Sequence, residues 1–345
     1  MQRVPMIARR ALIVAGLALP AAAGAQSPWK GYYAQGTRQR AVRFAADDGT
    51  MLAVTLLLPA WTELQRVPGL VLVAGSGPTD RNGNNPLVPA RIDTLRLIAE
   101  RLAQAGIGTL RYDKRGIGAS TPMPAALADQ ERFCAWDRFV GDVRAAHAEL
   151  LKHDEIKRYA TGLLGHSEGG LLVLAAAPTI SANKPHSIVL AATPGRPYGE
   201  LLRRQLQRGA PNLVDGVERV LGAIRTNGRP PAGLPAELQA LFPAYIGPFL
   251  QGAMAFDPAT ALAASPLGCL LVHGGADLQI VPMDDIQPLI DALGARSAGG
   301  EALVAAGVSH NLKTVTGPGD PGFTGPLAPV IGDKLAAWVR AALGT

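Results

Sequence analysis

The sequence predicts an α/β protein with a mostly parallel sheet and helices on both faces. From residue 41 to residue 192, short apolar runs alternate with longer stretches whose apolar residues recur at helical spacing. The chain has 345 residues, of which 48% are hydrophobic, so it can bury a large core. Glycine-rich turns with chemically reactive residues follow several of the apolar runs. Because sites in such folds lie at the carboxyl ends of the strands, these turns are the places to search for function.

The alternation begins with a hairpin in which residues 41–44 pair with residues 52–56 around a turn near 47–49. The remaining elements follow by their apolar runs and periodicity. Strands are expected near 69–74, 107–112, 159–164, 187–192, 269–273 and 302–304, and helices near 91–105, 136–152 and 169–177.

The alternation stops between Pro194 and Ser265, where no buried strand is evident. Residues 201–206 and 217–221 instead carry apolar side chains at helical spacing. We therefore expect a helical cap inserted at about 195–265 into one catalytic domain of residues 26–345. The insertion is placed to overhang the site, although a helical excursion packed elsewhere is the alternative.

The first 25 residues have the order of regions found in a signal peptide. Arg3, Arg9 and Arg10 precede the uncharged run 11–19, and residues 23–25 have the A-x-A form of a signal-peptidase site. We expect cleavage before Gln26 and export to the periplasm or the medium. The apolar run is too short for a hydrocarbon core of roughly 30 Å, so no stable membrane anchor is expected.

Charge and cysteine content exclude several classes. Removal of residues 1–25 takes away three arginines and no acid, so the formal charge falls from +6 to +3. No dense Lys/Arg run with interleaved aromatics is present, so a nucleic-acid partner is not expected. Cys134 lies near a helix start and Cys269 begins a strand, which favours two separate thiols over a disulfide. No metal-ligand spacing occurs, no cofactor is expected, and the oligomeric state is left open.

Residues 165–169 read Gly-His-Ser-Glu-Gly, directly after the apolar run 159–164 and before the helix-like stretch 171–175. A G-x-S-x-G pentapeptide between strand and helix is the arrangement of a nucleophile elbow. It would expose the hydroxyl of Ser167 beside a helix N-terminus, which favours developing negative charge. An ordinary glycine-rich turn is the alternative, so the assignment depends on partners for the serine.

In enzymes with this elbow the triad runs serine, acid, histidine along the chain. Asp277 follows the strand 269–273 on a glycine-bearing turn, and His310 is the only one of six histidines after it. We therefore predict Asp277 as the acid and His310 as the base. The alternatives are that Asp277 only forms the turn and that His310 is an exposed loop histidine. Asp284 and Asp285 are the fallback acids, although they look like the first turn of a helix.

An oxyanion hole is also required. One donor is expected to be the backbone N–H of Glu168, the residue after the nucleophile, with its side chain facing solvent. The second is expected from the loop after strand 69–74, where Ser76 or Gly77 can present a backbone N–H to the substrate oxygen. A plain surface turn is the alternative for this loop.

Five motifs together resemble the α/β-hydrolase superfamily, and within it the esterase-like group related to dienelactone hydrolases and serine aminopeptidases. They are Gly-Ser-Gly-Pro at 75–78 followed by Asp80-Arg81, the segment 113–120, the elbow, Gly-Gly-Ala-Asp at 274–277 and Ser-His-Asn at 309–311. The resemblance implies the α/β-hydrolase fold and serine hydrolase chemistry. It is less specific for substrate, because this fold hosts several activities. Segment 113–120 is expected to buttress the site.

The sequence therefore predicts a carboxylesterase that hydrolyses small to medium acyl esters through an acyl-enzyme intermediate. A serine aminopeptidase-like enzyme is one alternative, but that chemistry needs carboxylates for the substrate ammonium. The acids of the expected cap are outnumbered by arginines: Glu200, Asp215, Glu218 and Glu237 against Arg203, Arg204, Arg208, Arg219, Arg225 and Arg229. A catalytically silent binding protein on the same fold is the other alternative.

Overall fold

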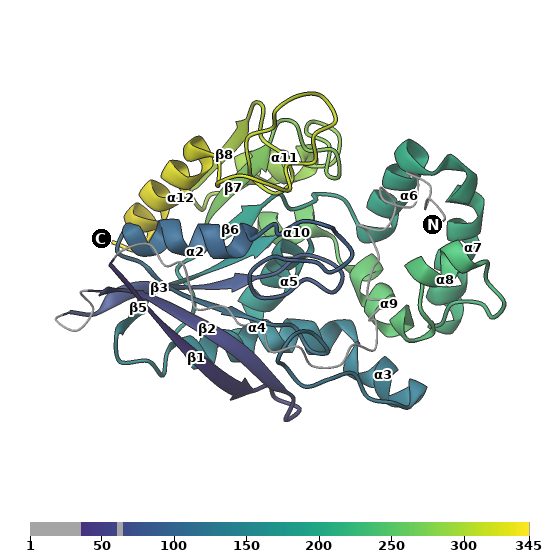
Figure 1. Cartoon of the computed structure of the whole chain (residues 1–345), viewed down its shortest axis with the longest axis horizontal. Coiled ribbons are helices and arrows are strands. Elements are labelled where there is room, and N and C mark those ends of the chain that lie inside the picture. Colours follow the sequence, from purple (N-terminus) through teal and green to yellow (C-terminus); the bar gives the residue numbers. More distant parts are fainter. Residues whose placement is uncertain (1–35, 61–64, 345) are drawn as a thin grey trace.

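The computed structural model describes residues 36–60 and 65–344. Its centre is an eight-stranded sheet with the order β1-β2-β4-β3-β5-β6-β7-β8 (Figure 1). β1 (Thr37–Ala45) and β2 (Met51–Pro59) form the expected antiparallel hairpin. β2 also runs antiparallel to β4, and the pairs from β4 through β3 to β8 are parallel. The predicted mostly parallel sheet is confirmed.

The parallel strands lie close to their expected positions. They are β3 (Val67–Val73), β4 (Gly108–Tyr112), β5 (Ile156–His166), β6 (Ser187–Ala191), β7 (Gly268–Gly274) and β8 (Gly300–Ala305). Every residue of β3, β4 and β6 is buried. This explains the apolar runs of β3 and β6, whereas β4 also buries Thr109 and Arg111.

Helices cover both faces of the sheet, as expected (Figure 1). α2 (Thr94–Gln104) and α12 (Pro329–Ala342) pack with Leu70 and Leu72 of β3 in one core. α4 (Trp136–Leu150) and α5 (Glu168–Ala176) pack with the alternate residues Val71 and Val73 in a second core. Successive strand side chains point to opposite faces, so one apolar strand supplies both cores.

Two local features differ from the sequence-based expectation. α3 (Leu127–Phe133) was not anticipated, because Glu131 is its only buried residue and it has no apolar stripe. α11 begins at Gln287 and ends at Ala295, so Asp284 and Asp285 lie in the preceding turn rather than in a helix. That turn is closed by the side chain of Asp285, which accepts a hydrogen bond from the N–H of Val281 at 2.9 Å.

Five helices lie between β6 and β7, and Figure 1 shows α6 to α9 gathered on one side of the molecule. They are α6 (Tyr198–Gly209), α7 (Val214–Asn227), α8 (Ala236–Leu241), α9 (Gly247–Ala255) and α10 (Pro258–Ala264). Phe249 of α9 joins this group to α4, with its ring 5.4 Å from Trp136 and 5.3 Å from Phe139, both edge-on. Such aromatic pairs stabilise the contact beyond the area they bury.

Neither cysteine forms a disulfide: Cys134 and Cys269 are both buried free thiols. Within residues 36–60 and 65–344, no helix has the length and apolar character needed to cross a membrane. The expected signal peptide and its cleavage site before Gln26 lie outside the described residues.

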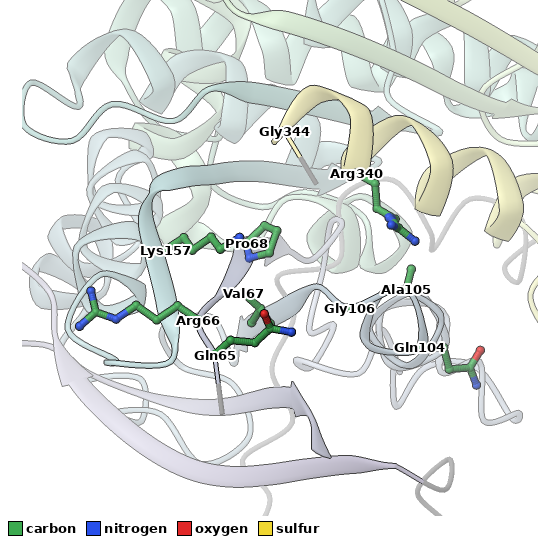
Figure 2. Close-up of a pocket in the computed structure, with 10 residues that line it drawn as sticks. All are labelled: Gln65, Arg66, Val67, Pro68, Gln104, Ala105, Gly106, Lys157, Arg340 and Gly344. Atoms are coloured by element: carbon green, nitrogen blue, oxygen red, sulfur yellow. The ribbon is translucent and has the colours of Figure 1, made fainter. Parts of the chain in front are cut away.

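A hollow of about 380 Å³ opens at the amino ends of the parallel strands (Figure 2). Arg66 and Val67 at the start of β3, Lys157 of β5 and Arg340 of α12 are among its lining residues. The predicted site residues follow the strands at the opposite edge of the sheet. Since sites in parallel sheets occupy the carboxyl edge, this hollow is separate from the candidate site.

Candidate active site

The candidate nucleophile occupies a strained turn between β5 and α5. β5 ends at His166, α5 begins at Glu168, and Ser167 between them has φ 55° and ψ −124°. Such a backbone is costly for a residue with a Cβ and is typical of functional positions. The N–H of Ser167 donates to the carbonyl of Ala191 on β6 at 2.8 Å, which anchors the turn to the sheet. The residues on either side are buried, whereas Ser167 is partly exposed.

The two glycines of the pentapeptide are required by close backbone contacts. A Cβ on Gly165 would lie 2.3 Å from the carbonyl carbon and oxygen of Gly169. A Cβ on Gly169 would lie 2.4 Å from the carbonyl oxygen of Val73 on β3. Neither contact can be relieved by a side-chain movement, because the opposing atoms belong to the backbone. The glycines therefore allow the helix to start directly against the strand.

We expect Gly165→Ala to lower the free energy of unfolding by about 3 kcal/mol or more, because the added methyl group meets backbone atoms. Gly222 of α7 provides the matched control, since nothing lies within 4 Å of a Cβ added there. Gly222→Ala should raise the free energy of unfolding by about 0.5–1 kcal/mol, as alanine favours the helix. Urea denaturation of both variants checks this. Equal stability of the two variants would contradict the close packing at the elbow.

The structure brings the predicted acid and base together, although they are 33 residues apart in the chain. Asp277 follows β7, and its Oδ2 lies 2.7 Å from Nδ1 of His310, which follows β8. Oδ1 of Asp277 accepts the N–H groups of Gln279 at 2.8 Å and Ile280 at 2.9 Å. A carboxylate bound to Nδ1 holds a proton there and leaves Nε2 to act as a base.

Two further histidines, His166 and His273, support this pair. Both precede Asp277 in the chain, so the order of the triad excluded them as the base. Nε2 of His166 lies 2.9 Å from the carbonyl oxygen of His310, and the two rings are 5.0 Å apart. His310 is thereby held beside the residue that precedes Ser167. Burial, with the nearby charge of His310, lowers the pKa of His166 to about 3, so it is a neutral donor. Nε2 of His273 lies 2.8 Å from the carbonyl of Ile280 and 3.2 Å from Oδ2 of Asp277.

A signal for both supporting histidines was present in the sequence. His166 is the last residue of β5, and His273 is the residue before the last of β7. Polar residues at the carboxyl ends of adjacent strands in a parallel sheet lie near one another. Their position at strand ends, rather than their place in chain order, identifies them.

The carboxyl of Asp277 is stabilised as an anion. Burial alone would raise its pKa, but the charge of His310 and hydrogen bonds from His273 and His310 hold the pKa well below its usual range. The unfolded chain therefore binds a proton at higher pH than the folded protein.

We expect Asp277 to stabilise the fold above pH about 4, the ordinary carboxyl value, and to lose this contribution as the pH falls through its lowered pKa. Urea denaturation of the wild type and of Asp277→Asn across a pH series measures the effect. The difference in free energy of unfolding between the two should shrink below pH about 4. A constant difference down to the lowest pH would contradict a stabilised carboxylate.

Asp284 and Asp285, the fallback acids, lie in surroundings that differ from those of Asp277. Asp284 is exposed. Asp285 is buried, and its Oδ2 accepts from Nη2 of Arg208 on α6 at 2.8 Å. Within the described residues, no hydrogen bond joins either carboxyl to His310. Asp285 therefore ties the helical insertion to the turn before α11.

The loop after β3 lies against the nucleophile. A Cβ on Gly75 would be 3.2 Å from Cβ of Ser167. The carbonyl of Ser76 accepts from Oγ1 of Thr79 at 2.7 Å, and Gly77 has φ 70°. Across from this loop, Glu168 is the first residue of α5, and the first N–H groups of a helix have no partner within it. The placement leaves both Ser76 and Gly77 open as the second oxyanion donor.

The side chain of Glu168 does not face solvent, and that expectation was wrong. It is buried against Lys114, whose Nζ lies 3.8 Å from Oε1, and the hydroxyl of Tyr198 donates to Oε2 at 3.4 Å. Burial raises the pKa of Glu168, and the charge of Lys114 opposes the rise. Sequence alone missed this because a carboxylate in the first turn of a helix is usually exposed.

The segment 113–120 forms a network of buried charges under the site. Asp113 accepts from the backbone N–H of Arg81 at 2.8 Å and from its Nη2 at 2.7 Å. Arg115 binds both oxygens of Asp142 on α4, at 2.8 and 2.5 Å. The contacts of Asp113 join the loop after β4 to the loop after β3, and those of Arg115 join it to α4.

In the part of the chain that the structure describes, no group of three or more His, Cys, Asp or Glu side chains is arranged to hold a metal ion. The cluster of His166, His273, His310 and Asp277 is joined instead by hydrogen bonds and ring contacts.

Comparison with known proteins finds a similar family over part of the chain. Residues 92–235 match the family model of serine aminopeptidase S33, a range that contains Ser167. No curated protein matches the chain.

Solved structures resemble it over most of its length. Est1E from Butyrivibrio proteoclasticus, with ferulic acid bound, is 15% identical, with a TM-score of 0.56 over 88% of this chain and 100% of that one. An esterase from Pyrococcus furiosus is 15% identical, with a TM-score of 0.58 over 96% and 97%. The α/β hydrolase GrgF from Penicillium sp. sh18 is 19% identical, with a TM-score of 0.56 over 89% and 100%. The chain has the α/β-hydrolase fold, and residues 92–235 are similar to the serine aminopeptidase S33 family.

Proposed function

We propose that the protein is a serine hydrolase that acts as a carboxylesterase on small to medium acyl esters. The observation that carries the proposal is the buried hydrogen bond of 2.7 Å between His310 and Asp277. The ring of His310 lies 5.0 Å from that of His166, which directly precedes a serine with φ 55° at a strand-to-helix turn. The family match and the esterase-like fold support the same chemistry.

In the proposed mechanism, Oγ of Ser167 attacks the ester carbonyl carbon while Nε2 of His310 takes the hydroxyl proton. The negative oxygen of the tetrahedral intermediate is held by the N–H of Glu168 and a second N–H from Ser76 or Gly77. Collapse breaks the ester C–O bond, and the alcohol leaves with the proton from His310. Water then attacks the acyl-enzyme by the same proton transfers, which releases the acid and regenerates Ser167.

Glu200 and Glu218 of the helical insertion are paired with arginines, which favours an ester over a peptide with a free N-terminus. An aminopeptidase needs an available carboxylate for the substrate ammonium. Glu200 instead lies 2.9 Å from Arg196 and 3.4 Å from Arg204, and Glu218 forms an ion pair with Arg203. Glu168, the residue after the candidate nucleophile, is held by Lys114 and Tyr198.

A substrate panel tests the proposal. We expect p-nitrophenyl esters from acetyl to octanoyl to be hydrolysed with higher kcat/KM than aminoacyl anilides. Est1E binds ferulic acid, so a feruloyl ester belongs in the panel as well. Fluorophosphonate labelling of Ser167, located by peptide mass spectrometry, identifies the nucleophile. Faster turnover of the anilides would favour the aminopeptidase, and no label at Ser167 would favour a silent binding protein.

We also propose that the protein is exported and that the mature chain begins at Gln26. The order of charged, apolar and small residues in the first 25 positions supports this. Intact mass measurement of the protein recovered outside the cytoplasm checks the start. A chain that retains Met1 there would contradict cleavage.

A further inference from the structure

The proposed mechanism does not use the buried ion pair of Lys114 and Glu168 behind the elbow. Their side chains are 1% and 7% exposed, and Nζ lies 3.8 Å from Oε1. A buried pair is weak support for stability, because the loss of hydration offsets the attraction, and apolar replacements are often as stable. The other hydrogen bonds of the pair therefore indicate its role better than its contribution to stability does.

Lys114 connects this pair to the loop that lies against the nucleophile. Its Nζ donates to the carbonyl oxygen of Gly75 at 2.5 Å. Gly75 is the residue whose added Cβ would be 3.2 Å from Cβ of Ser167. The same peptide unit carries the N–H of Ser76. In a planar trans peptide the C=O and N–H point in opposite directions, so fixing the carbonyl also fixes the direction of this N–H.

We propose that Lys114 is a positioning residue for the oxyanion hole. It holds the Gly75–Ser76 peptide so that the N–H of Ser76 supplies the second donor to the negative oxygen. This inference rests on the proposed function, and it selects Ser76 over Gly77. A cationic donor on the carbonyl also polarises the peptide, which strengthens donation by its N–H.

Glu168 and Tyr198 hold the lysine in place. Glu168 accepts from Tyr198 of α6 at 3.4 Å and faces Lys114 from the first turn of α5. The two oxyanion donors are thereby linked: Glu168 carries the first N–H on its backbone and supports the second through its side chain. The contact with Tyr198 extends this link to the helical insertion.

Lys114→Met tests the inference. We expect kcat per active site, counted by complete fluorophosphonate labelling, to fall about 10- to 100-fold, because outright removal of one oxyanion donor costs about 10²–10³. KM should change by about twofold or less. The affinity for a trifluoromethyl ketone analogue of the ester should fall by the same factor as kcat, since its tetrahedral adduct places a negative oxygen in the hole.

The double variant Lys114→Met/Glu168→Leu is the second test. The single variant leaves the buried carboxylate of Glu168 without its partner and could fail to fold, whereas the double variant leaves no unpaired buried charge. We expect it to fold and to show the same losses. Lys313→Met is the matched control: Lys313 is also buried, and its Nζ donates to a backbone carbonyl, that of Phe323, at 2.9 Å. It should lower the melting temperature and leave kcat per labelled site unchanged.

If the folded Lys114 variants keep both kcat and analogue affinity, Lys114 is only structural and the inference is overturned. Loss of kcat with unchanged analogue affinity overturns it as well, because the oxyanion hole is then intact. If the wild type neither turns over esters nor is labelled at Ser167, the proposed function itself fails. The two failures are therefore distinguishable.

Discussion

Ser167→Ala is expected to lower kcat for ester hydrolysis by about 10⁴- to 10⁶-fold, because the nucleophile and its base act as one unit. The fold should be retained, since Ser167 is partly exposed and its backbone N–H still binds Ala191. Kinetics with a p-nitrophenyl ester, together with a melting curve, measure both effects. Ser265→Ala, at the end of α10, should keep full activity. Activity of Ser167→Ala near that of the wild type would mean that the pentapeptide is only a turn.

Asp277→Asn is expected to lower kcat by about 10⁴-fold, because an amide at this position favours the wrong tautomer of His310. The buried hydrogen bond of 2.7 Å between the two side chains is the contact that the substitution alters. The kcat value and the melting temperature should be measured on the same preparation. The catalytic loss should be present in protein that is fully folded.

Variants of two neighbouring aspartates distinguish a catalytic role of Asp277 from a structural one. Asp284→Asn should change neither kcat nor stability, because the side chain is exposed. Asp285→Asn should lower the free energy of unfolding by about 1–3 kcal/mol, because its buried carboxylate pairs with Arg208, and should leave kcat nearly unchanged. A large catalytic loss at Asp284 or Asp285, with Asp277→Asn active, would show that the acid was assigned to the wrong turn.

Much of the sheet could be predicted from the sequence because strand formation here depends on local pattern. β3 and β6 are buried on both faces, and the sequence shows them as short, mainly apolar runs. The elbow is local as well, since Gly165, Ser167 and Gly169 lie within five residues. α3 escaped prediction because its only fully buried residue, Glu131, carries no apolar signal.

The sequence by itself determined the order of the candidate triad, because only one histidine follows Asp277. It could not determine the environment of these residues, since burial depends on which distant elements pack together. The tertiary structure decided that Glu168 is buried against Lys114 and Tyr198, that His166 and His273 support the acid and base, and that Asp285 binds Arg208. Except for the contact of His273 with Asp277, these contacts join residues of different strands or of the loops and helices that follow them. They form only when the parallel sheet brings the carboxyl ends of those strands to one edge.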